Sequence, residues 1–265
     1  MSILGGKWAV VTGASSGIGA DCARILAARG CNVILVARRE DRLRALQQEI
    51  TANHDVQAHV IPMNMSAPDA PPALYERIRG LGLTADVLIN NAGFGLHGNF
   101  TDIPWEREQE MLQLNIVALV HLTKLFVKDM VARNFGYVML VSSIGAYQPS
   151  PTYATYSAAK SFVLNFGEAL NYELRHTNVK VSVLSPGVTA SEFLQVAGQK
   201  PTFYQRMTMM PSRRVAEAGI DAMLKGKPSK VPGLANALPV WLLRFMPRRM
   251  SAAMASAAMQ VGGAK

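Results

Sequence analysis

The sequence TGASSGIG at residues 12–19 lies between a short apolar run, WAVV, and a longer stretch that is typical of a helix. Its glycines, Gly13, Gly17 and Gly19, allow the backbone to come close to a pyrophosphate, whose charge the start of a helix favours. Their spacing differs from the common GxGxxG pattern, and a glycine-rich turn alone could be only a tight connection between strand and helix. With its flanking elements, the motif predicts a cradle for the phosphates of a dinucleotide.

Strand-like and helix-like segments alternate after this turn. Short runs rich in β-branched residues recur as NVILVAR, VQAHVIP, DVLINNAG, YVMLVSS and VKVSVLSPG. This alternation is typical of βαβ units and of a parallel sheet. We therefore expect an α/β fold, a doubly wound parallel sheet with helices on both faces. The helices are expected at about residues 18–29, 41–52, 72–80, 104–133 and 153–176.

The alternation ends after Gly187, and two further segments follow. Residues 189–212 contain two prolines and several aromatic and methionine residues. This composition suits a helical insertion over the strand ends, so we expect a substrate lid there. Prolines interrupt the chain repeatedly beyond residue 226. We expect one domain at residues 1–225 and a basic, apolar C-terminal extension at residues 226–265.

The basic excess of the chain lies in its last quarter. The 265 residues carry a net charge of +9, and residues 200–265 hold 11 of the 27 basic but only two of the 18 acidic side chains. Between residues 231 and 260, large apolar side chains are mixed with Arg244, Arg248 and Arg249, which suits peripheral contact with an anionic lipid surface. The competing uses are docking on an acidic carrier protein or a phosphate-bearing thioester, completion of a pocket, and packing in an oligomer.

Composition and the N-terminal residues favour a cytoplasmic protein. With 49% hydrophobic and 17% charged residues, the chain can bury a sizeable core. Cys22 and Cys31 both fall in the first helix-and-strand region, where a disulfide is not expected. The first residues lack the pattern of a secretory signal, and we expect no run of roughly 18 apolar residues that would span a bilayer.

Two classes of site find no support in the sequence. Residues 200–265 carry no recognisable nucleic-acid-binding motif despite their charge, so we expect no nucleic-acid partner. No two carboxylates share a metal-ligand spacing with the histidines, so we expect no metal site. The histidines are scattered at His54, His59, His97, His121 and His176.

Four motifs together resemble one protein family. Beside TGASSGIG, the chain carries Asn90-Asn91-Ala92-Gly93, the sequence YSAAK at residues 156–160 and the sequence SPG at residues 185–187. Over about residues 5–225 the chain resembles the short-chain dehydrogenase/reductase family. The resemblance implies a Rossmann fold and an enzyme that moves a hydride between a nicotinamide cofactor and a carbonyl or alcohol. It also implies a homodimer or homotetramer in which the two longest helices form a face.

The resemblance places a catalytic group at Asn115, Ser143, Tyr156 and Lys160. Tyr156 and Lys160 are four residues apart in a helical stretch, hence neighbours on one helix face. A phenol, with a pKa of about 10, needs a nearby positive charge to exchange its proton near neutral pH, and Lys160 supplies that charge. We expect Tyr156 to be the general acid, Ser143 to orient the carbonyl, and Asn115 to hold a water beside Lys160. Ser142 adjoins Ser143 but points to the opposite side of the strand.

The end of the second strand is expected to select the cofactor. An arginine there binds the 2′-phosphate of NADP, whereas an acidic residue accepts a hydrogen bond from the ribose of NAD. The strand ends in Arg38 and Arg39, so we expect NADP(H), with Arg38 as the first ligand, Arg39 as the second and Ser15 as a helper. Alternatively, these arginines form only a solvated helix start, and Glu40 or Asp41 faces the ribose.

Further cofactor contacts follow from the resemblance. Where similar proteins place an aspartate against the adenine, this chain has Asn64, whose carbonyl oxygen can accept from the adenine amino group. Ser191 stands where a threonine is commoner. The expected cofactor-binding residues are Gly13, Ser15, Ser16, Gly17, Ile18, Gly19, Arg38, Arg39, Asn64, Met65, Asn91, Ala92, Gly93, Tyr156, Lys160, Pro186, Gly187, Val188, Thr189 and Ser191.

The substrate pocket is expected around the strand ends and the lid, and most of its side chains are apolar. This favours a hydrophobic ketone, aldehyde or alcohol as substrate, with carbonyl reduction by NADPH as the main direction. Each of these side chains could equally be ordinary core. A non-catalytic protein that senses NADP(H) is the alternative function, against which the four catalytic residues argue. The expected pocket residues are Phe94, His97, Ser143, Tyr147, Phe193, Phe203, Tyr204 and Met207.

Overall fold

A seven-stranded parallel sheet lies at the centre of the computed structural model, which describes residues 3–200 and 202–259. Its strands are β1 (Trp8–Thr12), β2 (Asn32–Ala37), β3 (Ala58–Pro62), β4 (Ala85–Asn90), β5 (Gly136–Val141), β6 (Val179–Leu184) and β9 (Ser229–Lys230). They are ordered β3-β2-β1-β4-β5-β6-β9, so the winding direction reverses between β1 and β4. This order confirms the predicted doubly wound Rossmann fold, in which ligands bind beyond the carboxyl ends of the strands.

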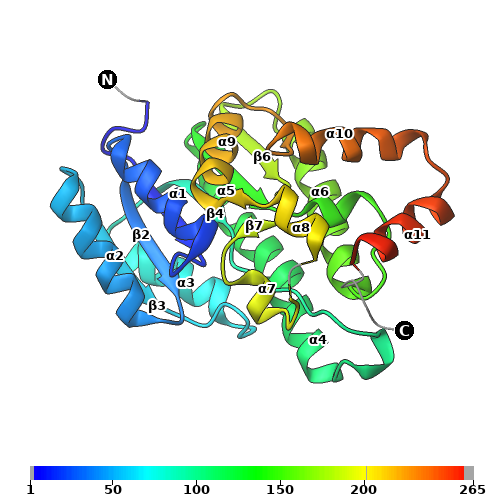
Figure 1. The fold of residues 1–265 in the computed structure, drawn as a ribbon. Helices are drawn as coiled ribbons and strands as arrows, with labels where there is room; N and C mark the ends of the chain where they lie inside the picture. The colour runs from blue at the N-terminus through cyan, green and yellow to red at the C-terminus, as the bar shows by residue number, and fades with distance from the viewer. Residues whose placement is uncertain (1–2, 201, 260–265) are drawn as a thin grey trace.

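Helices cover both faces of the sheet, as Figure 1 shows. One face carries α1 (Gly17–Ala28), α2 (Glu40–Asn53) and α9 (Ser212–Leu224), and the other carries α3 (Ala70–Gly80), α5 (Leu119–Ala132) and α6 (Ala154–Glu173). Side chains of a strand point alternately to the two faces. Within β1, Val11 therefore joins the hydrophobic cluster that contains Ile220 of α9, whereas Val10 joins the cluster that contains Phe126 of α5. The sheet is buried on both sides.

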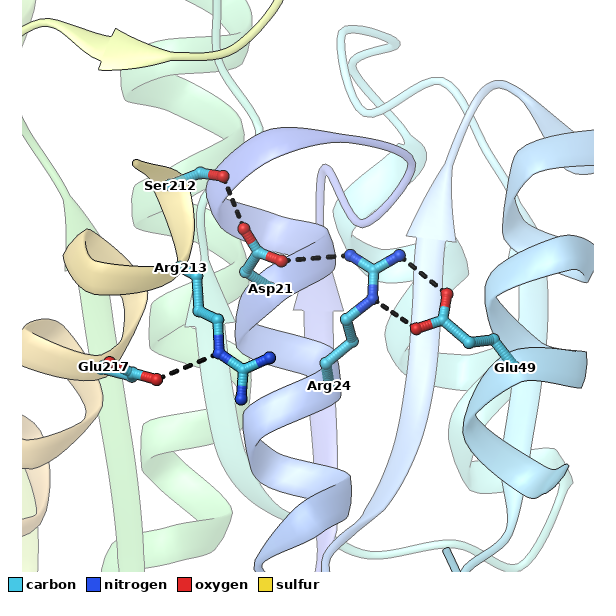
Figure 2. Close-up of polar contacts among 6 residues, drawn as sticks. All are labelled: Asp21, Arg24, Glu49, Ser212, Arg213 and Glu217. Atoms are coloured by element: carbon cyan, nitrogen blue, oxygen red, sulfur yellow. Dashed lines mark hydrogen bonds and ion pairs between the residues drawn. The ribbon is translucent and has the colours of Figure 1, made fainter. Parts of the chain in front are cut away.

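A chain of polar contacts ties α1 to its neighbours α2 and α9 (Figure 2). Arg24 of α1 donates from Nε and Nη2 to the two carboxylate oxygens of Glu49 at 2.7 and 2.8 Å, and its Nη1 lies 3.1 Å from Asp21. Ser212, at the start of α9, donates to the other oxygen of Asp21 at 2.5 Å. Because α1 begins at the glycine-rich turn, these contacts also fix the helix that supports that turn.

The helix expected at residues 104–133 is one helical stretch in three parts. These parts are α4 (Trp105–Leu112), a π-helical turn at Gln113–Ala118 and α5 (Leu119–Ala132). A π-helical turn accommodates an extra residue and is frequent at functional sites. The turn contains Asn115, whose side chain is fully buried. The sequence pattern did not predict this local change of helix geometry.

The same stretch, Trp105–Ala132, passes a test for a membrane-spanning helix by length and by its mean hydropathy of 1.4, which the sequence argument did not expect. Apolar side chains on one side of the stretch nevertheless pack on the sheet. Leu122, Phe126 and Met130 are buried in the hydrophobic cluster on that face. The stretch therefore has the packing of a core helix.

The lid segment, residues 189–212, is closed at its base by two short parallel strands. β7 (Thr189–Ala190) pairs with β8 (Met210–Pro211), and α7 (Phe193–Val196) and α8 (Phe203–Thr208) lie between them. The helical character expected for this segment is thus present. The paired ends hold the start and the end of the lid segment together.

The C-terminal residues also contribute to the sheet. β9 pairs with Val183 and Leu184 of β6, so the seventh strand comes from beyond residue 225, where the sequence placed the end of the domain. The chain continues with α10 (Leu234–Leu242), a 3-10 turn at Leu243–Phe245 and α11 (Arg248–Met259). In Figure 1, α10 reaches away from the sheet and α11 turns back toward it.

Candidate active site

A cavity of about 400 Å³ lies where the strands of the sheet end. Its wall is formed by segments that directly follow six strands, β1 to β6, and by the lid segment. The topology thus brings together residues that are far apart in the sequence. Every expected cofactor-binding residue lines this cavity except Gly19, which lies beneath the glycine-rich turn.

The glycine-rich turn has a backbone that only glycine adopts readily. Gly13 and Gly17 have φ angles of +68° and +54°, in the left-handed region that a Cβ disfavours. A Cβ on Gly19 would lie 2.3 Å from the carbonyl oxygen of Gly13, so this position tolerates no side chain. The turn faces the cavity and is followed by the N-terminus of α1, which favours negative charge. This shape fits the pyrophosphate of a dinucleotide.

Thr12 joins the end of β1 to the end of β4. Its Oγ1 accepts hydrogen bonds from the backbone nitrogens of Asn91 and Ala92, each at 3.0 Å. In return, Asn91 donates from Nδ2 to the backbone oxygen of Thr12 at 2.9 Å. These bonds hold the glycine-rich turn directly beside the segment after β4.

Tyr156, Ser143 and Lys160 meet in the same cavity. Tyr156 is hydrogen-bonded to Ser143, whose Oγ also accepts from the backbone nitrogen of Gly145 at 3.1 Å. Lys160 Nζ lies 5.8 Å from the centre of the Tyr156 ring and donates to the backbone oxygen of Val141 at 2.9 Å. A hydroxyl pair is therefore aimed at one point, with an ammonium group beside it.

Ser142 has a different role from its neighbour. Its hydroxyl donates to the backbone oxygen of Lys160 at 2.7 Å, which ties the end of β5 to α6. The two serines thus make separate contacts, as the alternation of a strand predicts. Ser143 is the hydroxyl next to Tyr156.

The pKa shifts at this site follow from burial. Burial raises the pKa of Tyr156 to about 12, although the hydrogen bond from Ser143 opposes this shift. Burial also lowers the pKa of Lys160 to about 8. The sequence argument expected Lys160, together with the oxidised nicotinamide, to favour the phenolate of Tyr156, whereas the net shift of the Tyr156 pKa is upward because loss of solvent dominates. At neutral pH the phenol therefore keeps its proton.

Asn115 acts on the backbone next to the site. Its Nδ2 donates to the backbone oxygen of Phe94 at 2.8 Å, and its Oδ1 accepts from the backbone nitrogen of the same residue at 3.2 Å. The side chain also packs against Gly93, where a Cβ would lie 2.7 Å from Oδ1 and 3.3 Å from Lys160 Nζ. Asn115 thereby fixes the segment after β4 and does not itself line the cavity.

Arg39 and Arg38 line the cavity with different environments. Arg39 is half-buried and donates from Nη2 to the hydroxyls of Ser15 and Ser16, each at 3.0 Å. Arg38 is 68% exposed and has Glu110 at 3.9 Å. Arg39 and not Arg38 is thus held against the glycine-rich turn, while the ranking of the two as ligands of a 2′-phosphate stays a prediction. Ser15 lies where the sequence argument expected a helper.

Known proteins are similar to this chain both in sequence and in fold. A family model described as short chain dehydrogenase matches residues 7–202. The chain belongs to the short-chain dehydrogenase family. This confirms the family that the four motifs indicated.

Several named members of the family are moderately similar to this chain in sequence. The chain is 34% identical over 195 residues to a very-long-chain 3-oxoacyl-CoA reductase of Aspergillus clavatus, a match that covers 72% of this chain and 56% of that protein. It is 31% identical over 189 residues to a 7beta-hydroxysteroid dehydrogenase of Mediterraneibacter gnavus, a match that covers 71% of each. The solved structure of a short-chain dehydrogenase from Sphingobium yanoikuyae in complex with NADPH superposes with a TM-score of 0.81 at 27% identity over 98% of both chains. The chain thus spans little more than half of the Aspergillus protein.

Within this short-chain dehydrogenase, three of the expected substrate-pocket residues line the cavity, namely Phe94, Ser143 and Phe193. The ring of Phe193 lies 5.4 Å from that of Tyr156. Tyr147 does not line the cavity, contrary to expectation. It ends the 3-10 helix Ile144–Tyr147 and packs against the cluster of Ala146, Leu164 and Val183. The short helix turns it away from the strand end.

The other expected pocket residues lie elsewhere. The ring of His97 is tilted against that of Tyr153, with ring centres 5.2 Å apart, and His97 is absent from the cavity wall. Met207 is 72% exposed and also lies outside the wall. The side chains of Phe203 and Tyr204 are outside the part of the chain that the structure describes. Of the expected lid residues whose side chains the structure describes, Phe193 lines the cavity and Met207 does not.

Two buried polar residues that the sequence argument missed line the cavity near Tyr156, together with Tyr153. The Tyr153 hydroxyl donates to Gln199 Oε1 at 2.7 Å, and Gln205 Nε2 donates to the same oxygen at 3.2 Å. Tyr153 stands three residues before Tyr156 and so on the same helix face, a signal that was available in the sequence. Gln199 and Gln205 carry no such signal, because no periodicity places them in the lid.

Metal binding finds no site within the described residues. No group of three or more histidine, cysteine, aspartate or glutamate side chains lies close enough together there to hold an ion.

Proposed function

We propose that this protein is an NADP(H)-dependent oxidoreductase that interconverts a carbonyl and an alcohol on a predominantly hydrophobic substrate, mainly as a carbonyl reductase. The observation that carries the proposal is the position of Tyr156, Ser143 and Lys160 on the wall of the same cavity as the glycine-rich turn. A nicotinamide cofactor held at that turn supplies a hydride when bound. The side chains supply the proton and the orientation of the substrate.

The proton chemistry favours reduction. With its pKa raised to about 12, Tyr156 carries a proton at neutral pH and can donate it to a carbonyl oxygen as general acid. Ser143 can donate to the same oxygen and so orient it. Lys160, with its pKa lowered to about 8, is mostly charged at neutral pH. Its charge stabilises the phenolate that forms when Tyr156 gives up its proton. Carbonyl reduction thus starts with Tyr156 protonated, which is its state at neutral pH.

The arginines support NADP(H) over NAD(H). A guanidinium group binds phosphate through paired, charge-assisted hydrogen bonds. Arg39 lies against Ser15 and Ser16 at the start of the cradle, where donors of this kind would meet the 2′-phosphate. The family member from Sphingobium yanoikuyae has a solved structure with NADPH.

The wall beyond Tyr156 supports an uncharged, hydrophobic substrate. Phe94, Phe193, Leu194 and Val196 form much of it. Among the described residues of the wall, the charged side chains other than Lys160 are Arg38, Arg39 and Glu192, and these lie by the cradle. Hydroxysteroid and 3-oxoacyl substrates, named for the two relatives, are the first classes to examine.

A carbonyl panel tests this function. Purified protein with NADPH should oxidise the cofactor, followed by its absorbance, on at least one keto-steroid, 3-oxoacyl thioester or retinoid-like aldehyde, and more slowly on small keto acids. Substitution of NADH in the same assay gives the cofactor preference. NADPH binding without turnover on every class would contradict the proposal and favour a sensing role.

We also propose that the protein is cytoplasmic and self-associates as a homodimer or homotetramer. The thiols of Cys22 and Cys31 are free and buried, as a reducing compartment allows. Large apolar side chains are exposed on the longest helical stretches, with Val117 at 50% and Phe162 at 43%. An interface through these helices would cover them, and sedimentation equilibrium of the full chain measures the order of the oligomer.

We propose peripheral contact with an anionic membrane surface through residues 231–260, of which residue 260 lies outside the described part. Five exposed apolar side chains follow the spacing of one helical face from α10 into the next turn. Arg244, Arg248 and Arg249 are exposed beside them, and residues 226–259 contain no acidic side chain. Apolar residues next to cations suit the boundary of an anionic lipid layer. The apolar residues are Leu234, Leu238, Trp241, Leu242 and Phe245, each at least 46% exposed.

Flotation with liposomes tests this contact. The full chain should float with vesicles that contain phosphatidylserine, and the double variant Trp241→Ser with Phe245→Ser should lose most of this binding, because the exposed aromatic pair is removed. Tyr172→Ser is the matched control, since Tyr172 is 66% exposed on α6. Equal flotation of wild type and double variant, or none of the wild type, would remove the proposal.

A further inference from the structure

Glu192 lies between the lid segment and the cofactor cradle. It lies two residues after the end of β7, and its carboxylate is bound by two arginines that lie just after the end of β2. Arg39 Nη1 lies 2.8 Å from one oxygen, and Arg42 Nη1 lies 2.5 Å from the other. These hydrogen bonds, first from Arg42 and then from Arg39, lower the pKa of Glu192 to about 2, so the group is ionised at any physiological pH.

The guanidinium group of Arg39 is shared between two partners. Nη2 donates to the hydroxyls of Ser15 and Ser16 on the glycine-rich turn, whereas Nη1 faces Glu192. All four residues line the same cavity. The start of the lid segment is also packed onto the turn, because a Cβ on Gly17 would lie 3.0 Å from Cβ of Ser191. Glu192 is thus placed at the cradle itself and not on a remote surface.

A carboxylate and a phosphate are alternative partners for one guanidinium group, since both accept its paired hydrogen bonds. A 2′-phosphate that binds Arg39 would add a charge of about −2 next to the carboxylate of Glu192. The two anions repel one another when both lie against the guanidinium group of Arg39. Glu192 is therefore a competitor at the position that the proposed function assigns to the 2′-phosphate.

We propose that Glu192 is a specificity-determining residue that weakens NADP(H) binding by competing with the 2′-phosphate for Arg39. This inference rests on the proposed NADP(H) dependence. NAD(H) lacks the 2′-phosphate and leaves the ion pair of Glu192 and Arg39 intact. The carboxylate of Glu192 thus makes the affinities for NADP(H) and NAD(H) more alike. When NADP(H) binds, Glu192 is released from Arg39, and the lid segment loses one of its contacts with the cofactor cradle.

Calorimetric titration with adenosine 2′,5′-bisphosphate and with adenosine 5′-monophosphate tests the inference without turnover. Glu192→Gln keeps the size of the side chain and removes its charge. We expect the variant to bind the bisphosphate roughly three- to five-fold more tightly, as suits the loss of one half-exposed ion pair, and the monophosphate with unchanged affinity. NADPH and NADH titrations should show the same difference.

Glu217→Gln is the matched control. Glu217 also pairs with an arginine, Arg213 Nε at 3.2 Å (Figure 2), and neither of these two residues lines the cavity. The Glu217→Gln variant changes the net charge by the same amount as Glu192→Gln. It should leave the affinities for the bisphosphate, the monophosphate, NADPH and NADH unchanged. An unchanged or weaker affinity of Glu192→Gln for the bisphosphate would overturn the inference. Wild-type protein that binds both nucleotides equally would instead contradict the proposed 2′-phosphate site.

Discussion

The Tyr156→Phe variant is expected to lose about 10²- to 10⁴-fold in turnover on any carbonyl that the wild-type protein reduces, the range of a lost general acid. The affinity for NADPH should stay within about two-fold, because none of the arginines or glycines that line the cradle changes. This combination separates a chemical role of the hydroxyl from a structural one.

The packing of the ring explains why the protein should fold normally. Tyr156 lies against Tyr153 and Phe193, with ring centres 5.7 and 5.4 Å away, and phenylalanine preserves both contacts. The substitution removes only the hydroxyl that is bonded to Ser143. Because that hydroxyl retains its proton at neutral pH, its loss removes the proton donor and leaves the cavity otherwise intact.

Steady-state kinetics and NADPH fluorescence titration measure the two effects on the same preparations. Tyr147→Phe is the matched control, since it removes a tyrosine hydroxyl from a residue outside the cavity wall. That variant should keep nearly full turnover. Full activity of Tyr156→Phe would show that another group provides the proton.

The sheet could be predicted because its central strands have a simple local signature. All six residues of β4 and of β5 are buried, and both strands read as apolar runs that end at polar or small residues. β9 has only two residues, which is too few for any periodicity. Its pairing depends on the geometry of β6 and the chain after α9. The π-helical turn also lacked a periodic signal, and it contains Asn115, which bonds to Phe94, 21 residues away.

The site could be predicted in its motifs but not in its side-chain directions. The resemblance to the family placed Tyr156, Lys160 and Ser143 together, and all three line one cavity. The choice between Arg38 and Arg39 depended on where α2 begins, and Arg39 is the residue directly before it, so its side chain turns back to the glycine-rich turn. Glu192 was missed for a related reason, because only the folded lid segment brings it to the arginines.

The double variant Arg38→Asp with Arg39→Leu is expected to lower the ratio of kcat/KM with NADPH to that with NADH by about 100-fold or more. Each charge-assisted hydrogen bond to phosphate contributes roughly 1.5–3 kcal/mol, and each 1.4 kcal/mol is about ten-fold in affinity. The new aspartate also repels the 2′-phosphate and can accept from the ribose hydroxyl of NAD. NADPH should therefore weaken strongly while NADH is little changed or improved.

The single variants and a control assign this effect to a residue. Arg39→Leu alone should account for most of the fall in the ratio of kcat/KM with NADPH to that with NADH. The reason is that Arg39 contacts Ser15 and Ser16, whereas Arg38 is largely exposed. Arg44→Leu removes an exposed arginine of α2 that pairs with Glu40 and is not on the cavity wall, so it should leave the ratio unchanged. Equal losses with both cofactors in the double variant would place the 2′-phosphate elsewhere, because only a group that meets this phosphate can separate the two cofactors.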